Sequence, residues 1–182
     1  MRLALEKMSS EYVGLAWKFR VSPESCDNPD HYESFLRLSA ITEQNSGRGV
    51  THVLVTLDDE SGNVNDDSEI IGFMTLRATS LVDSTSKLSY VRPSLEIAEL
   101  AINQKHERQG FGTKLVGAAI LIATQLNERF IGIQNVVLCA DPKAVGFYEK
   151  PDVGFGKMTD YYDILPDGWN DHCVPMYIRL SI

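Results

Sequence analysis

The sequence contains few cysteines, fewer basic than acidic residues and no long apolar run, and each shortage excludes a class of protein. Its three cysteines, Cys26, Cys139 and Cys173, are too few and too scattered for a disulfide framework. We expect all three to be packing thiols in a reducing compartment. No segment approaches the roughly 20 apolar residues of a membrane span, and charges interrupt the start of the chain every few positions. We therefore expect neither a signal peptide nor a membrane segment, and a cytoplasmic location.

The shortage of basic residues gives the protein an acidic character. It has 17 Lys and Arg against 25 Asp and Glu, a formal net charge of -8. Such a charge favours solubility and repels a nucleic-acid backbone at long range. The hydrophobic fraction of 43% and the charged fraction of 23% are those of an ordinary globular protein. Since domains commonly contain about 100–200 residues, we expect one domain over residues 1–182.

The N-terminal third predicts one short strand and two helices. The strand is expected at Leu3–Leu5 and the first helix from Ser9 or Ser10, with apolar residues at helical spacing after it. The second helix has a clearer start, because Asn28 is a capping residue and Pro29 suits the first helical position. We expect that helix to end near residues 45–49.

Two strands and two polar segments follow. Thr51–Leu57 and Glu69–Leu76 are rich in β-branched and apolar residues, and we expect them to pair antiparallel. The acidic residues 58–68 between them lack the EF-hand spacing, so a solvated hairpin loop is preferred to a calcium site. The polar segment Asp83–Pro93 is predicted to be a mobile surface loop.

The second half begins with a strand, a turn, a helix and a strand. Leu95–Ile102 is apolar with two glutamates, Lys105–Gly112 carries two glycines, Thr113–Phe130 has helical apolar spacing, and Asn135–Ala140 is short and apolar. This order predicts a right-handed βαβ unit whose two strands are parallel. A short helix is expected from Asp141 through Tyr148, and a closing strand is expected at Val174–Leu180.

The glycine-bearing turn is a candidate anion site. Gly110 and Gly112 allow a close approach to backbone N–H groups at the start of the helix, where the helix dipole favours an anion such as a pyrophosphate. Arg108 and Lys114 would add positive charge. The same turn is equally compatible with a tight strand-to-helix connection that binds nothing.

The order of the segments EIAELAI, RQGFGTKL, VVLCADPKAVGFYEK and VGF resembles the core of the GNAT N-acetyltransferases over Leu95–Phe155. The resemblance implies an α/β fold of the α+β type, with a central mixed sheet that splays at a parallel strand pair and carries helices on both faces. It also implies acetyl-coenzyme A as the co-substrate and no metal. The coenzyme contacts that it implies are Leu100, Ala101, Ile102, Arg108, Gln109, Gly110, Phe111, Gly112, Thr113 and Asp141. Asp141 is equally compatible with simple helix capping.

The sequence departs from the family pattern at two places. Glu107 stands where the family has Arg or Gln, three residues before the first glycine of the turn, which weakens a side-chain role there but not the backbone cradle. Pro151 and Asp152 appear as two extra residues between Tyr148 and the following Gly-Phe pair. We expect a bulge or a longer helix end at that point.

Tyr148 is the main catalytic candidate. Phe147-Tyr148 matches the family's aromatic pair, whose tyrosine stands near the coenzyme sulfur, and a phenol there can donate a proton to the departing thiolate. The alternative is a buried helix tyrosine with a backbone partner, which spacing alone would favour.

Acylation also needs a neutral amine, and therefore a base that removes its proton. Glu96 and Glu99 lie on the predicted strand, on opposite faces if it is regular. Glu96 matches a glutamate that serves as base in some GNAT enzymes, and the alternatives are a salt-bridged carboxylate, Glu99 or water. His106 is expected to be an exposed loop histidine, with a phosphate or ribose contact as the alternative.

No metal is expected. The pairs His172-Cys173 and Cys26 with His31 do not form a convincing zinc-ligand set.

Three functions follow from the resemblance. The first is direct acetyl transfer from acetyl-coenzyme A to a primary amine of a small molecule or a protein, for which the acidic composition favours a cationic acceptor. The second rests on a looser resemblance of SCDNPDHYESFLRLSA, THVLVTL and EIIGFMTLRATSL to GNAT toxins of toxin–antitoxin systems, which acetylate aminoacyl-tRNA; the net charge argues against such an RNA substrate. The third is a non-catalytic module that binds the coenzyme. A homodimer is compatible with all three, and a membrane partner is not expected.

Overall fold

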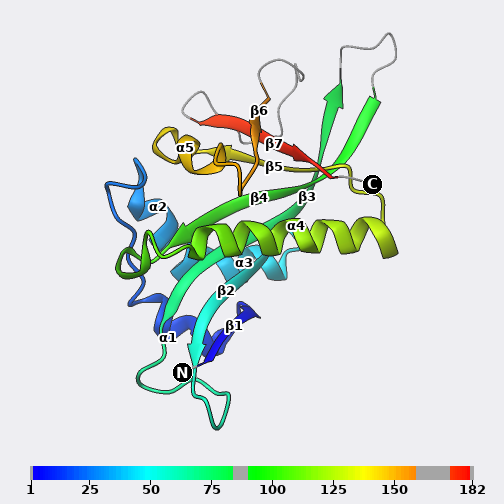
Figure 1. Cartoon of the computed structure of the whole chain (residues 1–182). Coiled ribbons are helices and arrows are strands. Elements are labelled where there is room, and N and C mark those ends of the chain that lie inside the picture. The colour runs from blue at the N-terminus through cyan, green and yellow to red at the C-terminus, as the bar shows by residue number, and fades with distance from the viewer. Residues whose placement is uncertain (1, 84–89, 159–172, 181–182) are drawn as a thin grey trace. The chain divides into compact units, whose positions relative to one another are not determined.

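The computed structural model describes residues 2–83, 90–158 and 173–180. Within them, seven strands form one mixed sheet in the order β1-β2-β3-β4-β5-β7-β6 (Figure 1). The strands are β1 Arg2–Lys7, β2 Val50–Leu57, β3 Ile70–Asp83, β4 Tyr90–Ile102, β5 Asn135–Ala140, β6 Gly156–Lys157 and β7 Val174–Arg179. The helical segments are η1 Ser10–Tyr12, α1 Val13–Ala16, α2 Pro29–Ser34, η2 Phe35–Ser39, α3 Ala40–Asn45, η3 Gln104–His106, α4 Phe111–Arg129, η4 Pro142–Ala144 and α5 Val145–Tyr148.

The chain divides into two compact units. The first comprises Met1–Leu76 and Glu99–Leu115, and the second comprises Arg77–Ala98 and Val116–Ile182. Strands β3 and β4 and helix α4 each begin in one unit and end in the other. A single domain over residues 1–182 remains a prediction.

The core of the first unit explains its local structure. Strand β2 alternates between partly exposed and buried residues, as expected of a strand with one face on a core. It pairs antiparallel with β1 and with β3, as the sequence predicted. The buried residues of β2 and β3, among them Val53, Val55 and Phe73, pack in one cluster with Leu15, Phe19 and Leu36 of the N-terminal helical region. Burial of these side chains is what holds the short helices on the sheet, since short helices are marginal alone.

The opposite sheet face of the same unit receives the start of α4. Successive residues of a strand point to opposite faces, so a Cβ at Gly72 would point away from the core that buries Phe73. Such a Cβ would lie 3.2 Å from Leu115 Cδ1 and 2.6 Å from Ile102 Cδ1. Helical segments therefore lie on both faces of the sheet here, as the resemblance implied.

The helix predicted from Asn28 to about residue 45 is present but not regular. The Asn28 side chain accepts a hydrogen bond from the His31 backbone N–H at 3.2 Å, and Pro29 is the first helical residue. The middle of the segment, Phe35–Ser39, is a π-helix, and α3 ends at Asn45. Leu36 and Ala40 are buried on the core side, so apolar spacing identified the packed face although it did not reveal the π-helix.

The second unit contains the predicted parallel strand pair. Ser94–Ile97 of β4 pairs parallel with Asn135–Leu138 of β5, and β5 pairs antiparallel with β7. Among the described residues, the β4–β5 ladder stops at Ile97, while β4 continues to Ile102 and β5 to Ala140. The ladder thus ends before either strand does, as expected of a sheet that splays at its parallel pair.

Two expectations from the sequence were wrong, and one strand was missed. Asp83 and Tyr90–Pro93, which were predicted to lie in a mobile loop, belong to β3 and β4; residues 84–89 lie outside the described part of the chain. The expectation of three packing thiols was wrong for Cys139 and Cys173, which form a disulfide with Cα atoms 5.5 Å apart; Cys26 is buried and its thiol donates to the Ser22 carbonyl at 3.9 Å. The short strand β6 was not predicted.

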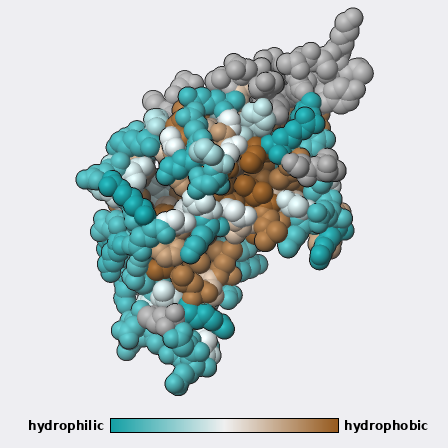
Figure 2. All heavy atoms as spheres, viewed as in Figure 1, coloured by the Kyte–Doolittle hydropathy of each residue, from teal (hydrophilic) through white to brown (hydrophobic). Residues whose placement is uncertain are grey.

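Some apolar side chains remain exposed. Leu3 and Leu5 lie on edge strand β1 and are 43% and 36% exposed, and Leu121, Phe130 and Ile131 at and beyond α4 are more than half exposed. Figure 2 shows a largely hydrophilic surface with apolar residues gathered in part of it. No helix among the described residues is long and apolar enough to cross a membrane. A homodimer remains a prediction, since exposed apolar residues are ordinary on the surface of a monomer.

Candidate functional site

The turn before α4 has an unusual backbone conformation. Arg108 has a φ of 60° and Gly110 a φ of 83°, so the chain passes twice through the left-handed region within three residues. An added Cβ at Gly110 would have nothing within 4 Å, so this glycine is present for its conformation rather than for packing. Helix α4 begins at Phe111, and the N–H groups of its first turn have no partner inside the helix. Together these features fit an anion at the helix start.

Positive side chains flank the turn. The Arg108 side chain is 86% exposed and lies 3.8 Å from the Glu24 carboxylate, a surface pair of little stabilising value. Lys114 Nζ lies 5.1 Å from the centre of the Phe111 ring. A bound phosphate would compete with Glu24 for Arg108. Glu107, the residue that departs from the family pattern, accepts a hydrogen bond from the Ser25 hydroxyl at 2.8 Å.

His106 is not the exposed loop histidine that the sequence predicted. Its side chain is 19% exposed, and its Nε2 lies 2.8 Å from Glu69 Oε1. Its ring also meets the Phe111 ring edge to face. Because these contacts fix the residue beside the start of α4, we assign it a role in holding the turn.

The strand segment that precedes the turn is tightly fixed. Ala101 is buried in the core cluster of the first unit, and its backbone oxygen lies 2.9 Å from the position of a Cβ at Gly72. Asn103 then ends the strand, with its backbone N–H donating to the Ile71 carbonyl and its side chain donating to the Ile70 carbonyl. These backbone contacts are all with β3, so the segment Leu100–Ile102 is held on its β3 side.

Tyr148 lies at the end of α5, as expected. It is 7% exposed, its ring packs edge to face on Phe147 and Phe155, and its backbone carbonyl accepts from Phe155 N–H. Burial raises the pKa of its phenol, which keeps the group protonated at neutral pH. A protonated phenol is what donation to a thiolate requires, but a core tyrosine would show the same burial. The two extra residues Pro151 and Asp152 form a turn closed by Gly154 N–H donating to the Lys150 carbonyl.

Glu96 is buried in an ion pair. It is 2% exposed, and its two carboxylate oxygens accept from Arg77 Nε and Nη2, each at 2.8 Å. This two-pronged geometry is strong and oriented. The salt-bridged alternative for Glu96 has thus gained an identified partner, and its role as base remains a prediction.

Glu99, three residues further along β4, has a different partner. Its two carboxylate oxygens each lie 3.0 Å from His31 Nε2 on α2. The hydrogen bond that His31 donates to Glu99, and secondarily the charge of Glu99, raise the pKa of His31, while partial burial lowers it. Sequence reasoning named His31 only as a rejected zinc ligand.

Asp141 acts as a helix cap. Its side chain accepts a hydrogen bond from Lys143 N–H at 2.9 Å at the start of η4. Capping explains its presence without the coenzyme, and a coenzyme contact remains a prediction. Within the described part of the chain, no group of His, Cys, Asp and Glu side chains could hold a metal ion; His172 lies outside that part.

The comparisons with known proteins agree with this topology. Residues 18–155 match the model of the Acetyltransferase (GNAT) family. No match is found among curated proteins.

Several solved structures share the fold. A tyrosine-to-phenylalanine mutant of KacT has a TM-score of 0.72 and 17% identity, covering 98% of this chain and 95% of that one. A similar mutant of the AtaT toxin, bound to the C-terminus of the antitoxin AtaR and acetyl-CoA, has a TM-score of 0.69 and 15% identity, covering 97% and 92%. AtaT complexed with acetyl-methionyl-tRNAfMet has a TM-score of 0.67 and 18% identity, covering 96% and 94%. At these identities, the likeness is one of fold.

Proposed function

Because the chain belongs to the GNAT acetyltransferase family, we propose that it transfers an acetyl group from acetyl-coenzyme A directly to a primary amine. The observation that carries the proposal is the turn at Arg108–Gly110, which brings left-handed backbone and exposed N–H groups to the start of α4 in the order strand, turn, helix, parallel strand. The resemblance to the family implies that coenzyme A binds at a segment with this order of elements.

Each proposed site residue has a defined task. The backbone N–H groups from Arg108 to Thr113, including those of Gln109, Phe111 and Gly112, bind the pyrophosphate, and Arg108 adds charge. The backbone of Leu100, Ala101 and Ile102 binds pantetheine and the thioester oxygen, and stabilises the oxyanion of the tetrahedral intermediate. Asp141 is proposed to contribute a further coenzyme contact.

The chemistry needs no covalent enzyme intermediate. The neutral amine attacks the thioester carbon, the tetrahedral intermediate collapses, and the carbon–sulfur bond breaks. Tyr148 donates its phenolic proton to the departing thiolate, and the phenolate takes up the proton that the attacking nitrogen loses as the amide forms. Burial raises the pKa of the phenol, so the proton is present at neutral pH but is released less readily than from an exposed tyrosine.

The test measures thiol release from acetyl-coenzyme A with a panel of amines, identifying products by mass spectrometry. The panel contains spermidine, an aminoglycoside, a lysine peptide, glycinamide and charged tRNA. Release of free thiol with formation of an acetylated amine supports an enzyme. Binding of acetyl-coenzyme A without turnover on any amine would instead indicate a binding module and overturn the proposal.

Two variants separate binding from chemistry. Gly112→Asp places a carboxylate at the second residue of α4 and should remove most of the stabilisation by acetyl-coenzyme A, about 2.7 kcal/mol at one hundred times the dissociation constant. Gly117→Asp is its control on the same helix, since an added Cβ there meets nothing within 4 Å. An unchanged melting shift in Gly112→Asp would remove the turn as phosphate site.

Tyr148→Phe should lower turnover by about 10²–10⁴-fold while coenzyme affinity changes little. Tyr12→Phe is the matched control, because Tyr12 is also 7% exposed and packs in the core of the first unit. Near-normal turnover by Tyr148→Phe would leave the tyrosine with a packing role only.

A second candidate is acetylation of aminoacyl-tRNA. The fold similarity to AtaT complexed with acetyl-methionyl-tRNAfMet favours it. The net charge of -8 opposes it, because RNA binding needs a positive surface. The charged tRNA in the panel distinguishes the two candidates. Acetylation of its aminoacyl group at low salt, at a rate that falls steeply as the salt concentration is raised, would favour aminoacyl-tRNA over a small amine as the acceptor. An antitoxin-like protein partner would be a further proposal only in that case.

A further inference from the structure

Two ionisable side chains meet beside the proposed thioester segment. His31 comes from α2 and Glu99 from β4, 68 positions apart in sequence, and the imidazole Nε2 lies 3.0 Å from both carboxylate oxygens. The His31 side chain is 50% exposed and that of Glu99 is 16% exposed. The carboxylate is therefore largely buried, and the imidazole is the accessible end of the pair.

The pair sets the tautomer of the histidine. A carboxylate only accepts hydrogen bonds, so Nε2 must carry the proton that it donates to Glu99. Nδ1 is then the ring nitrogen with a lone pair. When Nδ1 accepts a proton, the resulting imidazolium faces a carboxylate already in contact with it, and this is the arrangement by which carboxylate–histidine pairs make a base.

Aromatic rings fix the orientation of the imidazole. The Tyr32 ring meets it edge to face with centres 5.2 Å apart, and the Phe35 ring lies 6.4 Å away. Phe35 in turn stacks on Phe73 of β3 at 6.1 Å. Among the described residues, Glu99 of β4 is the charged group in contact with His31 from another element, and Tyr32 and Phe35 are its ring neighbours on its own helical segment.

The location on β4 relates the pair to the proposed reaction. Glu99 immediately precedes Leu100–Ile102, the backbone proposed to hold the thioester, and alternation places its side chain on the same strand face as Ala101. Two residues along a strand span about 6.5 Å. The pair thus belongs to the same unit and the same strand end as this segment.

We infer that His31, oriented by Glu99, is the base that takes the proton from the acceptor ammonium before it attacks acetyl-coenzyme A. This inference rests on the proposed function. One N–H bond of the ammonium breaks, its proton passes to His31 Nδ1 directly or through one water, and the freed lone pair attacks the thioester carbon. The imidazolium then releases its proton to solvent. Glu99 is a positioning residue, since it acts only through His31.

The same role suits His31 better than Glu96. Glu96 is 2% exposed and binds Arg77 through both oxygens, whereas the His31 imidazole is half exposed. The ordinary pKa of histidine also lies near neutral pH, where a base works most efficiently.

The experiment uses His31→Gln, whose side-chain amide can still donate to Glu99 but cannot accept a proton at neutral pH. With spermidine and glycinamide as acceptors, we expect kcat/KM to fall by about 10²–10⁴-fold while acetyl-coenzyme A still raises the melting temperature. The acid limb of the wild-type pH profile that reports His31 should disappear. In Glu99→Gln that limb should move to lower pH, because the hydrogen bond to a carboxylate, and secondarily its charge, no longer raise the pKa of His31.

The controls separate this inference from the proposed function. His52→Gln removes a histidine on β2 and should leave the limb in place. Wild-type turnover with unchanged kcat/KM and pH profile in His31→Gln would overturn the role of His31 alone, while Tyr148→Phe would still test acyl transfer. No thiol release by the wild type with any amine overturns both. An NMR titration in which the pKa of the His31 ring does not fall in Glu99→Gln would overturn the pair itself.

Discussion

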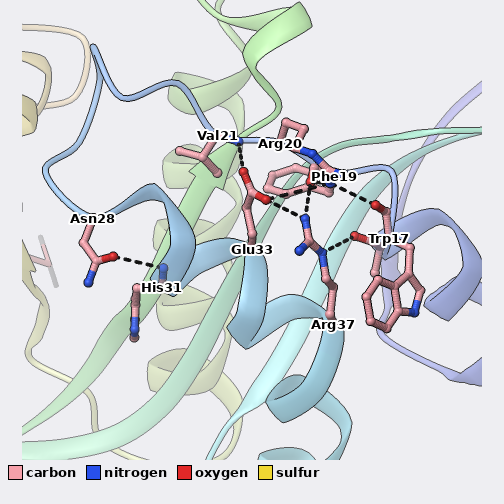
Figure 3. A network of polar contacts seen from close by, with 9 residues as sticks. Trp17, Phe19, Arg20, Val21, Asn28, His31, Glu33 and Arg37 are labelled. Carbon is pink, nitrogen blue, oxygen red and sulfur yellow. Dashed lines mark hydrogen bonds and ion pairs between the residues drawn. The ribbon is translucent and has the colours of Figure 1, made fainter.

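Glu33 offers the sharpest test of how the N-terminal helical region is held. Its carboxylate on α2 accepts from Val21 N–H at 3.0 Å and from Arg37, and lies 3.8 Å from Arg20. Figure 3 shows these contacts converging on Glu33. Its side chain is only 12% exposed. The two arginines also donate to backbone carbonyls at Ala16, Trp17 and Phe19. One carboxylate therefore joins α2 to the segment that follows α1.

Glu33→Gln keeps the shape and removes the charge. Whichever way the amide turns, its NH₂ faces either Val21 N–H or Arg37, so one buried donor meets another donor. An unsatisfied buried donor costs about 1–3 kcal/mol, and breaking a buried ion pair costs about 3–5 kcal/mol. Because Arg37 keeps two carbonyl partners, we expect a loss of about 2–3 kcal/mol, or roughly 4–12 °C in Tm for a chain of this size.

The assay is urea unfolding followed by the fluorescence of Trp17, whose ring centre lies 5.6 Å from Arg37 Cζ, in a background that carries Trp169→Phe. Glu43→Gln is the matched control, because the Glu43–Arg48 pair is exposed, with the arginine side chain 61% accessible. It should cost less than about 1 kcal/mol. Equal losses in the two variants, or a loss below about 0.5 kcal/mol in Glu33→Gln, would refute the reasoning.

Two further predictions concern packing and the disulfide. Gly72→Ala should cost about 1–3 kcal/mol in urea unfolding and weaken acetyl-coenzyme A binding, because its Cβ would lie 2.9 Å from the Ala101 backbone oxygen; Gly117→Ala, with open space, should be neutral or stabilising. Cys139→Ser should lower stability by about 4 kcal/mol, since the disulfide closes a loop over a sequence separation of 34 residues. Alkylation of unreduced, denatured protein should label Cys26 alone, and labelling of all three cysteines would contradict the bond.

The sequence predicted those features that neighbouring residues determine. The Asn28 cap with Pro29 behind it is a local hydrogen bond, and the bounds of β5 follow from a compact apolar run. The parallel pairing of β4 with β5 was also predictable, because a strand, a helix and a strand in succession have few ways to pack.

Features that depend on distant residues were not predictable. The bond between Cys139 and Cys173 forms because β5 and β7 are neighbours, and the register that opposes Cys139 to Pro175 cannot be read from spacing. The extension of β3 beyond Leu76 was hidden because the mostly polar residues 77–80 interrupt the apolar run before Leu81 and Val82.

The candidate site divides in the same way. The glycine turn and Tyr148 carry local signals, so the sequence predicted their places in the fold, although their roles remain predictions. The partners of the two glutamates carry no local signal in the sequence. Arg77 contacts Glu96 from the neighbouring strand in the sheet, and His31 contacts Glu99 from 68 positions away in the chain. Alternation separated the two glutamates on the strand, but only the folded chain distinguishes an arginine-paired carboxylate from one that orients a histidine.

The contact between His31 and Glu99 predicts that the stability of the fold depends on pH. Hydrogen bonding to Glu99 holds the pKa of His31 above its usual 6.5, so the folded state binds a proton more tightly than the unfolded state. The stability that the pair contributes is therefore fully present below pH 6.5 and is lost as the pH rises through the folded pKa. His52 has the opposite sign, because burial lowers its pKa, so its contribution is present above pH 6.5 and is lost as the pH falls through its folded pKa. Urea midpoints of the wild type, His31→Gln and Glu99→Gln at pH 5.5 and 8.5 isolate the pair, since His52 contributes equally to all three. The urea midpoint of the wild type should exceed the midpoints of both variants by more at pH 5.5 than at pH 8.5. A difference that is constant with pH, or larger at pH 8.5, would mean that His31 gains no charged partner on folding.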